Sequence, residues 1–172
     1  MTRQELKRIA PYARGSNIDI YTPLLNKFMA HYGINTQARK AAFLATILHE
    51  SGSLTYTEEI ASGQAYEGRK DLGNTEAGDG KRYKGRGLIQ ITGRYNYSVA
   101  SMAMGIDLLK NPELLAKPDN ATWVSCWWWQ SKGLNELADK GDFRKVTRIV
   151  NGGLTGWDSR LTFYNRAKEV LK

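Results

Sequence analysis

A strongly apolar helical segment constrains the fold of this chain more than any other feature. The stretch TQARKAAFLATILHESG opens with Thr36, a residue type that caps helices, and closes at Gly52, a residue type that ends them. The stretch TPLLNKFMAHYG has the same pattern, with Thr22 as the cap, Pro23 in the first turn and Gly33 as the stop. The sequence therefore predicts a helix at both places, and helical patterning dominates the chain.

Further helical patterns lie on both sides of a segment that lacks them. Thr2 and Glu5 fit a capping box at the start of the chain. Between Gly52 and Gly93 the pattern gives way to glycines, charges and short alternating pieces, which favour a small antiparallel sheet or ordered loops. The later helices are expected at residues 96–104, 120–130, 142–150 and 158–171. We predict a mainly α fold (α+β), with two helical lobes and a small antiparallel sheet or loop region lining a central cleft.

Length and charge limit the domain organisation and the partners. A chain of 172 residues with 41% hydrophobic content suits one domain over residues 1–172. The 25 Lys and Arg against 17 Asp and Glu give a net charge of +8, which attracts polyanions such as nucleic acid, acidic cell-wall polymers or lipid headgroups. Cys126 is the only cysteine, and the first 22 residues lack the apolar core of a signal peptide. We expect synthesis in a reducing cytoplasm and no stable membrane insertion.

The acidic residues at and after the end of the 36–52 segment are the strongest candidates for chemistry. Glu50 lies where the helix dipole and apolar neighbours disfavour a negative charge, which suits a general acid. Glu58, Glu59 and Glu67 follow in a polar segment that favours ionised carboxylates. Two carboxyl groups with different environments form the usual acid and base of glycosidases. A glutamate at a helix end is also a common solvated surface residue, so spacing alone leaves both interpretations open.

Other chemistries fit the sequence less well. HESGS lacks the second histidine of the zinc motif H-E-x-x-H, and the only other histidine, His31, lies on a different predicted helix. In GDGKRYKGRG, Lys81 is followed by Arg82, where a phosphate-binding loop needs Ser or Thr. Cys126 lies in WVSCWWWQ, where an inert core position is favoured over a nucleophile. We expect no metal and no cofactor.

Four motifs, in this order, resemble those of glycoside hydrolase family 19, in particular its compact bacteriophage endolysins and related bacterial enzymes. The motifs are FLATILHESG, RYKGRGLIQITGRYNY, IVNGG and DSRLTFYNR, and the similarity spans roughly residues 43–164. The stretch GRGLIQITGRYNY is the most specific of them. The resemblance implies a lysozyme-like fold that hydrolyses β-1,4 links between N-acetylated amino sugars with inversion at the anomeric carbon. Phage members cut peptidoglycan, and plant-like members cut chitin.

The resemblance also implies roles for individual residues. Glu50 matches the general acid, and Thr92 matches the residue whose hydroxyl helps to hold the attacking water. Glu59 matches the second carboxylate of the phage enzymes, while Glu67 lies nearer the plant spacing and is kept as an alternative base. Arg160 matches the arginine that organises the carboxylates. The positions expected to bind or position substrate are His49, Gln90, Tyr95, Asn96, Asn151 and Arg160.

Some of these expectations leave alternatives open. Asn151 also suits the turn that NGG requires, and Arg160 also suits a surface salt bridge. We expect one catalytic domain without a separate wall-binding module, acting as a monomer on peptidoglycan or a related amino-sugar polymer, with no nucleic-acid partner. A chitinase is the alternative, and a noncatalytic sugar-binding protein is a less favoured one. An endolysin of this type would wait in the host cytoplasm until a holin releases it to the cell wall or periplasm.

Overall fold

The computed structural model describes residues 1–172 and consists of helices joined by loops. No β-strand forms, and only two isolated antiparallel bridges occur, one between Glu58 and Arg86 and one between Arg86 and Ile91. The short 3-10 helices are η1 (Gln64–Tyr66), η2 (Lys70–Leu72) and η3 (Pro112–Ala116). The α-helices are α1 (Arg3–Ile9), α2 (Gly15–His31), α3 (Gln37–Glu50), α4 (Asp79–Arg82), α5 (Arg94–Met104), α6 (Pro118–Ser131), α7 (Leu134–Asp139), α8 (Phe143–Asn151) and α9 (Trp157–Val170).

The predicted mainly helical fold is confirmed, but the middle of the chain forms loops and not a sheet. Arg86 and Ile91 exchange backbone hydrogen bonds of 3.0 and 2.7 Å across a tight turn. Within that turn, Gly87 and Gln90 both have positive φ, at +87° and +67°. A backbone that reverses so sharply cannot extend a ladder on either side. The β component of the predicted α+β fold is therefore absent.

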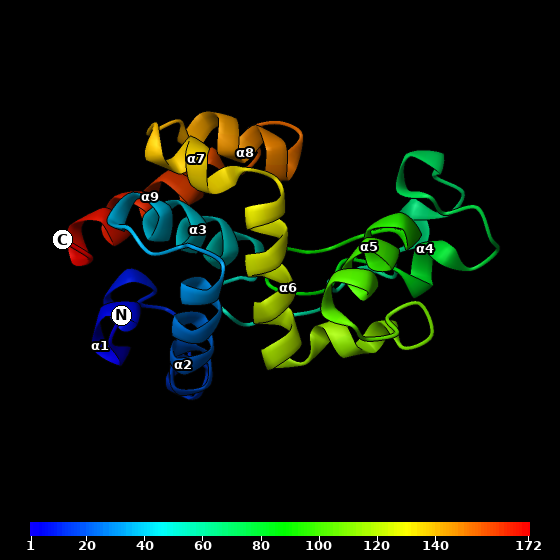
Figure 1. The fold of residues 1–172 in the computed structure, drawn as a ribbon, viewed down its shortest axis with the longest axis horizontal. Coiled ribbons are helices and arrows are strands. Elements are labelled where there is room, and N and C mark those ends of the chain that lie inside the picture. Colours follow the sequence, from blue (N-terminus) through cyan, green and yellow to red (C-terminus); the bar gives the residue numbers. More distant parts are fainter. The chain divides into compact units, whose positions relative to one another are not determined.

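The chain divides into two compact units (Figure 1). Unit 1 contains residues 1–55 and 126–172, and unit 2 contains residues 56–125. Unit 1 is therefore built from both ends of the chain, while unit 2 is the loop-rich middle that the glycines predicted. The predicted cleft between two lobes stays a prediction. None of the helices is both long enough and apolar enough to span a membrane.

The core of unit 1 surrounds α3. Residues 41–48 of this helix are all buried, and α3 packs against α9, α7 and α8 (Figure 1). Trp129 is fully buried in the same core, where its ring meets Phe43 edge-on at 5.3 Å and its indole N–H donates to Asn135 Oδ1 at 3.0 Å. Cys126 is also buried, and burial raises the pKa of its thiol. The apolar run thus forms the centre of the unit and places Glu50 at its edge.

The capping signals begin three helices where the sequence predicted them. Thr2 forms a capping box with Glu5 at the start of α1. Thr36 accepts a hydrogen bond of 3.2 Å from the backbone N–H of Arg39, which begins α3. Asp142 caps α8 in the same way. Each side chain satisfies an N–H group that has no partner within its helix.

The prediction that Thr22 caps a helix is wrong. α2 begins at Gly15 and continues through Pro23 to its end. Thr22 lies inside the helix and donates its hydroxyl to the carbonyl of Ile18 at 2.7 Å. Ile18 and Tyr21 are buried before the proline, so packing holds the first turns despite the hydrogen bond that a proline removes.

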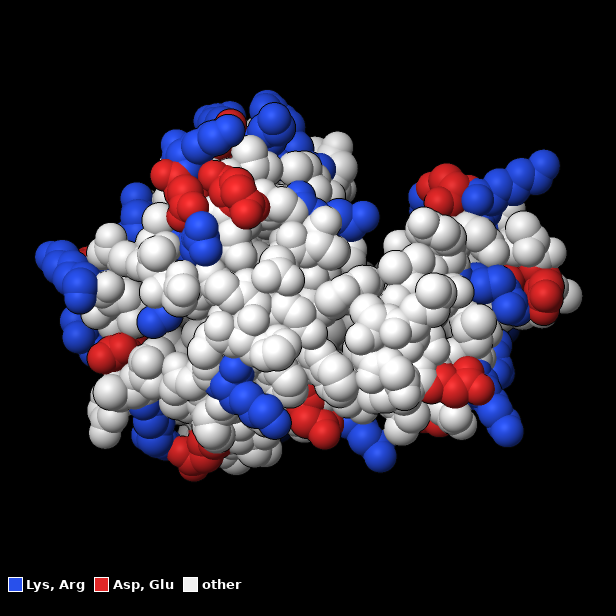
Figure 2. Space-filling view, viewed as in Figure 1, with Lys and Arg blue, Asp and Glu red and all other residues white.

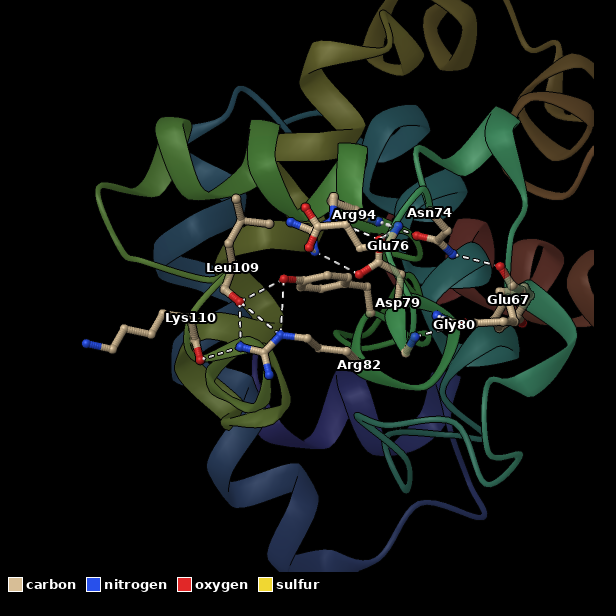
Figure 3. A network of polar contacts seen from close by, with 12 residues as sticks. Glu67, Asn74, Glu76, Asp79, Gly80, Arg82, Arg94, Leu109 and Lys110 are labelled. Atoms are coloured by element: carbon tan, nitrogen blue, oxygen red, sulfur yellow. Dashed lines mark hydrogen bonds and ion pairs between the residues drawn. The ribbon is translucent and has the colours of Figure 1, made fainter.

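A polar network holds the loops of unit 2 together (Figure 3). Asp79 is 1% exposed, and its carboxylate accepts two hydrogen bonds of 2.8 Å from the Arg94 guanidinium, which lower the pKa of Asp79. The backbone N–H of Arg94 donates to Asn74 Oδ1 at 2.8 Å. Arg82 donates to the carbonyl of Leu109 at 2.9 Å. These bonds, of which those made by the two guanidinium groups are charge-assisted, order a segment that has no sheet to hold it.

Candidate active site

Glu50 is the last residue of α3, and α9 supplies its partner. Arg160 Nη2 donates to Glu50 Oε1 at 2.5 Å, with side-chain exposures of 1% for Arg160 and 21% for Glu50. Arg160 Nε donates to the carbonyl of Thr155 at 3.0 Å, while its Nη1 is buried without a partner. The surroundings of Glu50 therefore include the buried positive charge of Arg160. Because Arg160 is buried, the alternative prediction that it forms a surface salt bridge is wrong.

His49 links the end of α3 to the start of α9. Its Nδ1 lies 3.0 Å from Ser159 Oγ. Its ring lies against Gly156, where a Cβ would come within 2.3 Å of His49 Cε1. Gly156 also has a φ of +74°, so both the close approach and the backbone conformation require glycine. Burial, followed by the charge of Arg160, lowers the pKa of His49 despite the opposing effect of Glu50. A neutral ring at neutral pH suits a positioning role.

Glu59 is held in unit 2 by donors to both of its carboxylate oxygens. The backbone N–H of Gly85 donates to Oε1 at 2.7 Å, and the hydroxyl of Tyr66 donates to Oε2 at 3.0 Å. The backbone N–H of Glu59 donates in turn to the carbonyl of Gly85 at 2.9 Å. These contacts fix the orientation of a carboxylate that stays partly exposed.

Gln90 and Thr92 meet at the same glycine. A Cβ on Gly85 would lie 2.7 Å from Gln90 Oε1 and 3.3 Å from Thr92 Oγ1, so a larger residue at this position would displace the Gln90 side chain. The hydroxyl of Thr92 donates to the carbonyl of Gln90 at 3.1 Å. Gln90 has a φ of +67°, a rare conformation that clusters at functional sites. The structure thus gathers three predicted site residues, Glu59, Gln90 and Thr92, around Gly85.

Glu67, the alternative base, has both oxygens engaged by the main chain. They accept N–H groups of Gly78 and Gly80, each at 2.8 Å. These two hydrogen bonds lower the pKa of Glu67. The carboxylate therefore fixes the loop before α4 and has no oxygen without a donor.

The other predicted site residues lie at helix ends. Asn96 donates from Nδ2 to the carbonyl of Thr92 at 2.8 Å, so it supports the loop that carries the hydroxyl. Tyr95 is 64% exposed in the first turn of α5. Asn151 is the exposed last residue of α8, and the following Gly152 has a φ of +80°. Asn151 therefore lies at the turn that NGG was expected to make.

Three residues of this site were missed by sequence reasoning. Gly85 lies inside the most specific motif, so its close contacts had a sequence signal. Tyr66 and Gly156 had no such sequence signal, because the loop geometry that brings Tyr66 to Glu59 and Gly156 against His49 is not encoded in any local pattern. The structure contains no group of three or more His, Cys, Asp or Glu side chains that could hold a metal ion.

A mainly helical chain with one candidate carboxyl at a helix end and another in a loop-rich unit falls in the lysozyme-like class. The family model for glycoside hydrolase family 19, described as chitinase class I, matches residues 25–138. An endochitinase of Arabidopsis thaliana is 37% identical over 126 residues, covering 73% of this chain and 43% of that protein. A glycosyl hydrolase family 19 domain-containing protein of Haemophilus influenzae is 39% identical over 107 residues, covering 62% and 51%. The chain belongs to glycoside hydrolase family 19.

Solved structures agree with this placement. A bacterial family 19 chitinase superposes with a TM-score of 0.79 at 26% identity, covering 99% of this chain and 94% of that one. Chitinase C from Streptomyces griseus HUT6037 superposes with a TM-score of 0.77 at 24% identity, covering 99% and 76%, and shows the fold alone. The family and the mainly helical fold predicted from the sequence are therefore confirmed. The chain spans about half the length of the curated relatives named above.

Proposed function

We propose that this chain is an endolysin-type glycoside hydrolase that cuts β-1,4 links between N-acetylated amino sugars of bacterial peptidoglycan with inversion. The observation that carries the proposal is the carboxyl of Glu50, which buried Arg160 holds through one oxygen while 21% of the side chain stays exposed. An acid fixed in this way can meet a ligand in a defined orientation. Membership of family 19 supports the same chemistry.

The acid step uses Glu50 and Arg160. Protonated Glu50 donates its proton to the glycosidic oxygen, and the electrons of the breaking C–O bond remain on that oxygen. Glu50 is then a carboxylate, and the guanidinium beside it stabilises the new negative charge. His49 contacts Ser159 and so links α3 to α9, which helps to hold Arg160 beside Glu50.

The base step uses Glu59 and Thr92. A water held by the Thr92 hydroxyl gives a proton to Glu59 and attacks the opposite face of the sugar. Both groups converge at Gly85, which supports Glu59 as the base, whereas the main chain occupies both oxygens of Glu67. Inversion requires the carboxyl groups of Glu50 and Glu59 to lie ~6.5–9.5 Å apart, which a crystal structure with a bound oligosaccharide measures.

The net charge of +8 favours peptidoglycan as the substrate. Cell-wall polymers are anionic and chitin is neutral, so a basic surface concentrates the protein on the former, most strongly at low salt. The relatives named as chitinases support chitin as the alternative substrate. We infer that the protein acts as a monomer and reaches the wall from the host cytoplasm when a holin opens the inner membrane.

The Glu50→Gln variant tests the proposal. Glutamine keeps an oxygen that accepts from Arg160 but has no proton to give, so we expect the turbidity loss of purified sacculi to slow by about 10²–10⁴-fold. Glu169→Gln, an identical change at an exposed position of α9, is the matched control. Mass spectrometry of the released fragments identifies the bond, and parallel assays on chitin oligomers decide between the substrates. A folded Glu50→Gln protein that still lyses sacculi at a substantial rate refutes the assignment.

A further inference from the structure

A concave surface lies within unit 1, where the start of α8 meets α9. It is a groove of about 270 Å³ whose lining includes Phe143, Arg144, Trp157, Leu161 and Tyr164. None of the predicted site residues lines it. Its volume is near the lower end of known ligand sites, which run from about 300 to 1,000 Å³, and suits one ring-sized group.

Three aromatic side chains give the groove a rigid floor. Phe143 and Tyr164 stack at 4.3 Å with an interplanar angle of 9°, and both are almost fully buried. Trp157 lies 5.5 Å from Phe143 at an angle of 37° and is only partly buried. Trp157 is therefore the ring that a ligand can reach, while the other two hold it in place. Aromatic rings bind sugars through the apolar C–H groups of the pyranose face.

The groove is lined by one basic side chain, Arg144, and one acidic side chain, Asp142, and α8 carries two further basic residues. α8 contains Arg144, Lys145 and Arg148 and no acidic residue, and none of the three forms an ion pair. The guanidinium of Arg144 lies 5.0 Å from the ring centre of Trp157, which places one of these charges directly at the groove. Figure 2 shows Lys and Arg side chains gathered over α7 and α8, with a few acidic side chains beside them.

Two acidic residues that precede α8 already accept hydrogen bonds from other groups of the protein. Asp139 is paired with Arg39 at 2.6 Å, and Asp142 accepts the backbone N–H of Lys145 at 3.0 Å as the cap of α8. The basic side chains of α8 are therefore available to an anion from outside the protein. A neutral sugar makes no ion pair, so the basic side chains of α8 favour a ligand that carries negative charge.

We infer that this groove is a second, noncatalytic site for an amino-sugar polymer that bears carboxylates. A sugar ring packs on Trp157, and a carboxylate of the polymer pairs with Arg144, which can donate two parallel hydrogen bonds. The inference rests on the proposed peptidoglycan function and deepens it. Such a site keeps the protein on the wall between cuts.

Binding is measured with the Glu50→Gln protein, so that no substrate is consumed. In this background we expect Arg144→Glu to weaken cosedimentation with purified sacculi by about tenfold, and Trp157→Ala to weaken it at least as much. Lys132→Glu is the matched control, because Lys132 also lies over a tryptophan, 5.7 Å from the ring of Trp128, away from the groove. We expect the control to change binding by less than about twofold. Circular dichroism checks the fold of every variant.

Three results overturn the inference. The first is unchanged binding in both groove variants, and the second is an equal loss in Arg144→Glu and Lys132→Glu, which means general charge attraction. The third is an equal loss on chitin beads and on sacculi, which means a neutral ligand. With Glu50 intact, Arg144→Glu should leave turnover of a short soluble oligosaccharide unchanged while slowing lysis of sacculi. If the parent chain shows no turnover, the proposed function is refuted. The binding measurements still test the groove in that case, because they do not depend on turnover.

Discussion

The contact between Glu50 and Arg160 can be measured directly by a double-mutant cycle. Removing one partner of a fully buried ion pair costs ~3–5 kcal/mol, whereas exposed pairs contribute ~0.2–1 kcal/mol. This pair lies between those limits, because Arg160 is 1% exposed and Glu50 is 21% exposed. With one direct hydrogen bond between them, we expect a coupling free energy of about 2 kcal/mol.

The cycle compares the parent chain with Arg160→Met, Glu50→Ala and the double variant. Urea unfolding followed by tryptophan fluorescence gives the free energy of unfolding of each protein. The pair of Arg39 and Asp139 is the control, since its side chains are 24% and 41% exposed and its coupling should be the smaller of the two. A coupling for Glu50 and Arg160 no larger than that of the control would refute the reasoning that burial strengthens this contact.

Three further predictions concern the neighbours of the two candidate carboxyl groups. Gly85→Ala should lower turnover about tenfold or more, because the new Cβ would lie 2.7 Å from Gln90 Oε1 and displace the side chain, while stability changes by only ~1 kcal/mol. Glu59→Gln should lose turnover in a sacculus assay, whereas Glu67→Gln should keep it and lose stability near neutral pH, where the lowered pKa of Glu67 keeps the wild-type carboxylate ionised. The lowered pKa of His49 means that the unfolded chain binds a proton before the folded chain does, so stability falls as pH drops below about 6.5. As the pH is lowered from about 7.5 to about 5, the melting temperature of the wild type should therefore fall toward that of His49→Gln.

Each of these predictions has a control or a contrary outcome. Gly15→Ala adds the same methyl group in α2, where its Cβ would lie 3.5 Å from Arg3 Nη2, and it should leave turnover unchanged. An active Glu59→Gln protein beside an inactive Glu67→Gln protein would reverse the assignment of the base. A melting-temperature difference for His49→Gln that stays constant across this pH range would show that the ring does not titrate on unfolding.

Most helices could be predicted because their signals are local. Thr36 caps α3 and Gly52 follows its end, as the sequence indicated, because a cap acts within one helical turn. The start of α2 was misplaced because the burial of Ile18 and Tyr21, a tertiary effect, outweighs the local preference of Pro23. Of the two structures expected for the middle segment, ordered loops form and a sheet does not, because turn conformations stop the pairing after isolated bridges.

The sequence by itself determined the family, the helical class and the identity of Glu50 as the leading candidate, because motifs and periodicity act over a few residues. The family resemblance suggested Arg160 as a partner of the carboxylates, and only the tertiary structure showed the contact itself. Arg160 lies 110 residues away along the chain and reaches Glu50 because α9 packs on α3. The groove at Trp157 likewise exists only where α8 meets α9. Contacts between distant segments depend on how whole helices pack, and no local pattern encodes that packing.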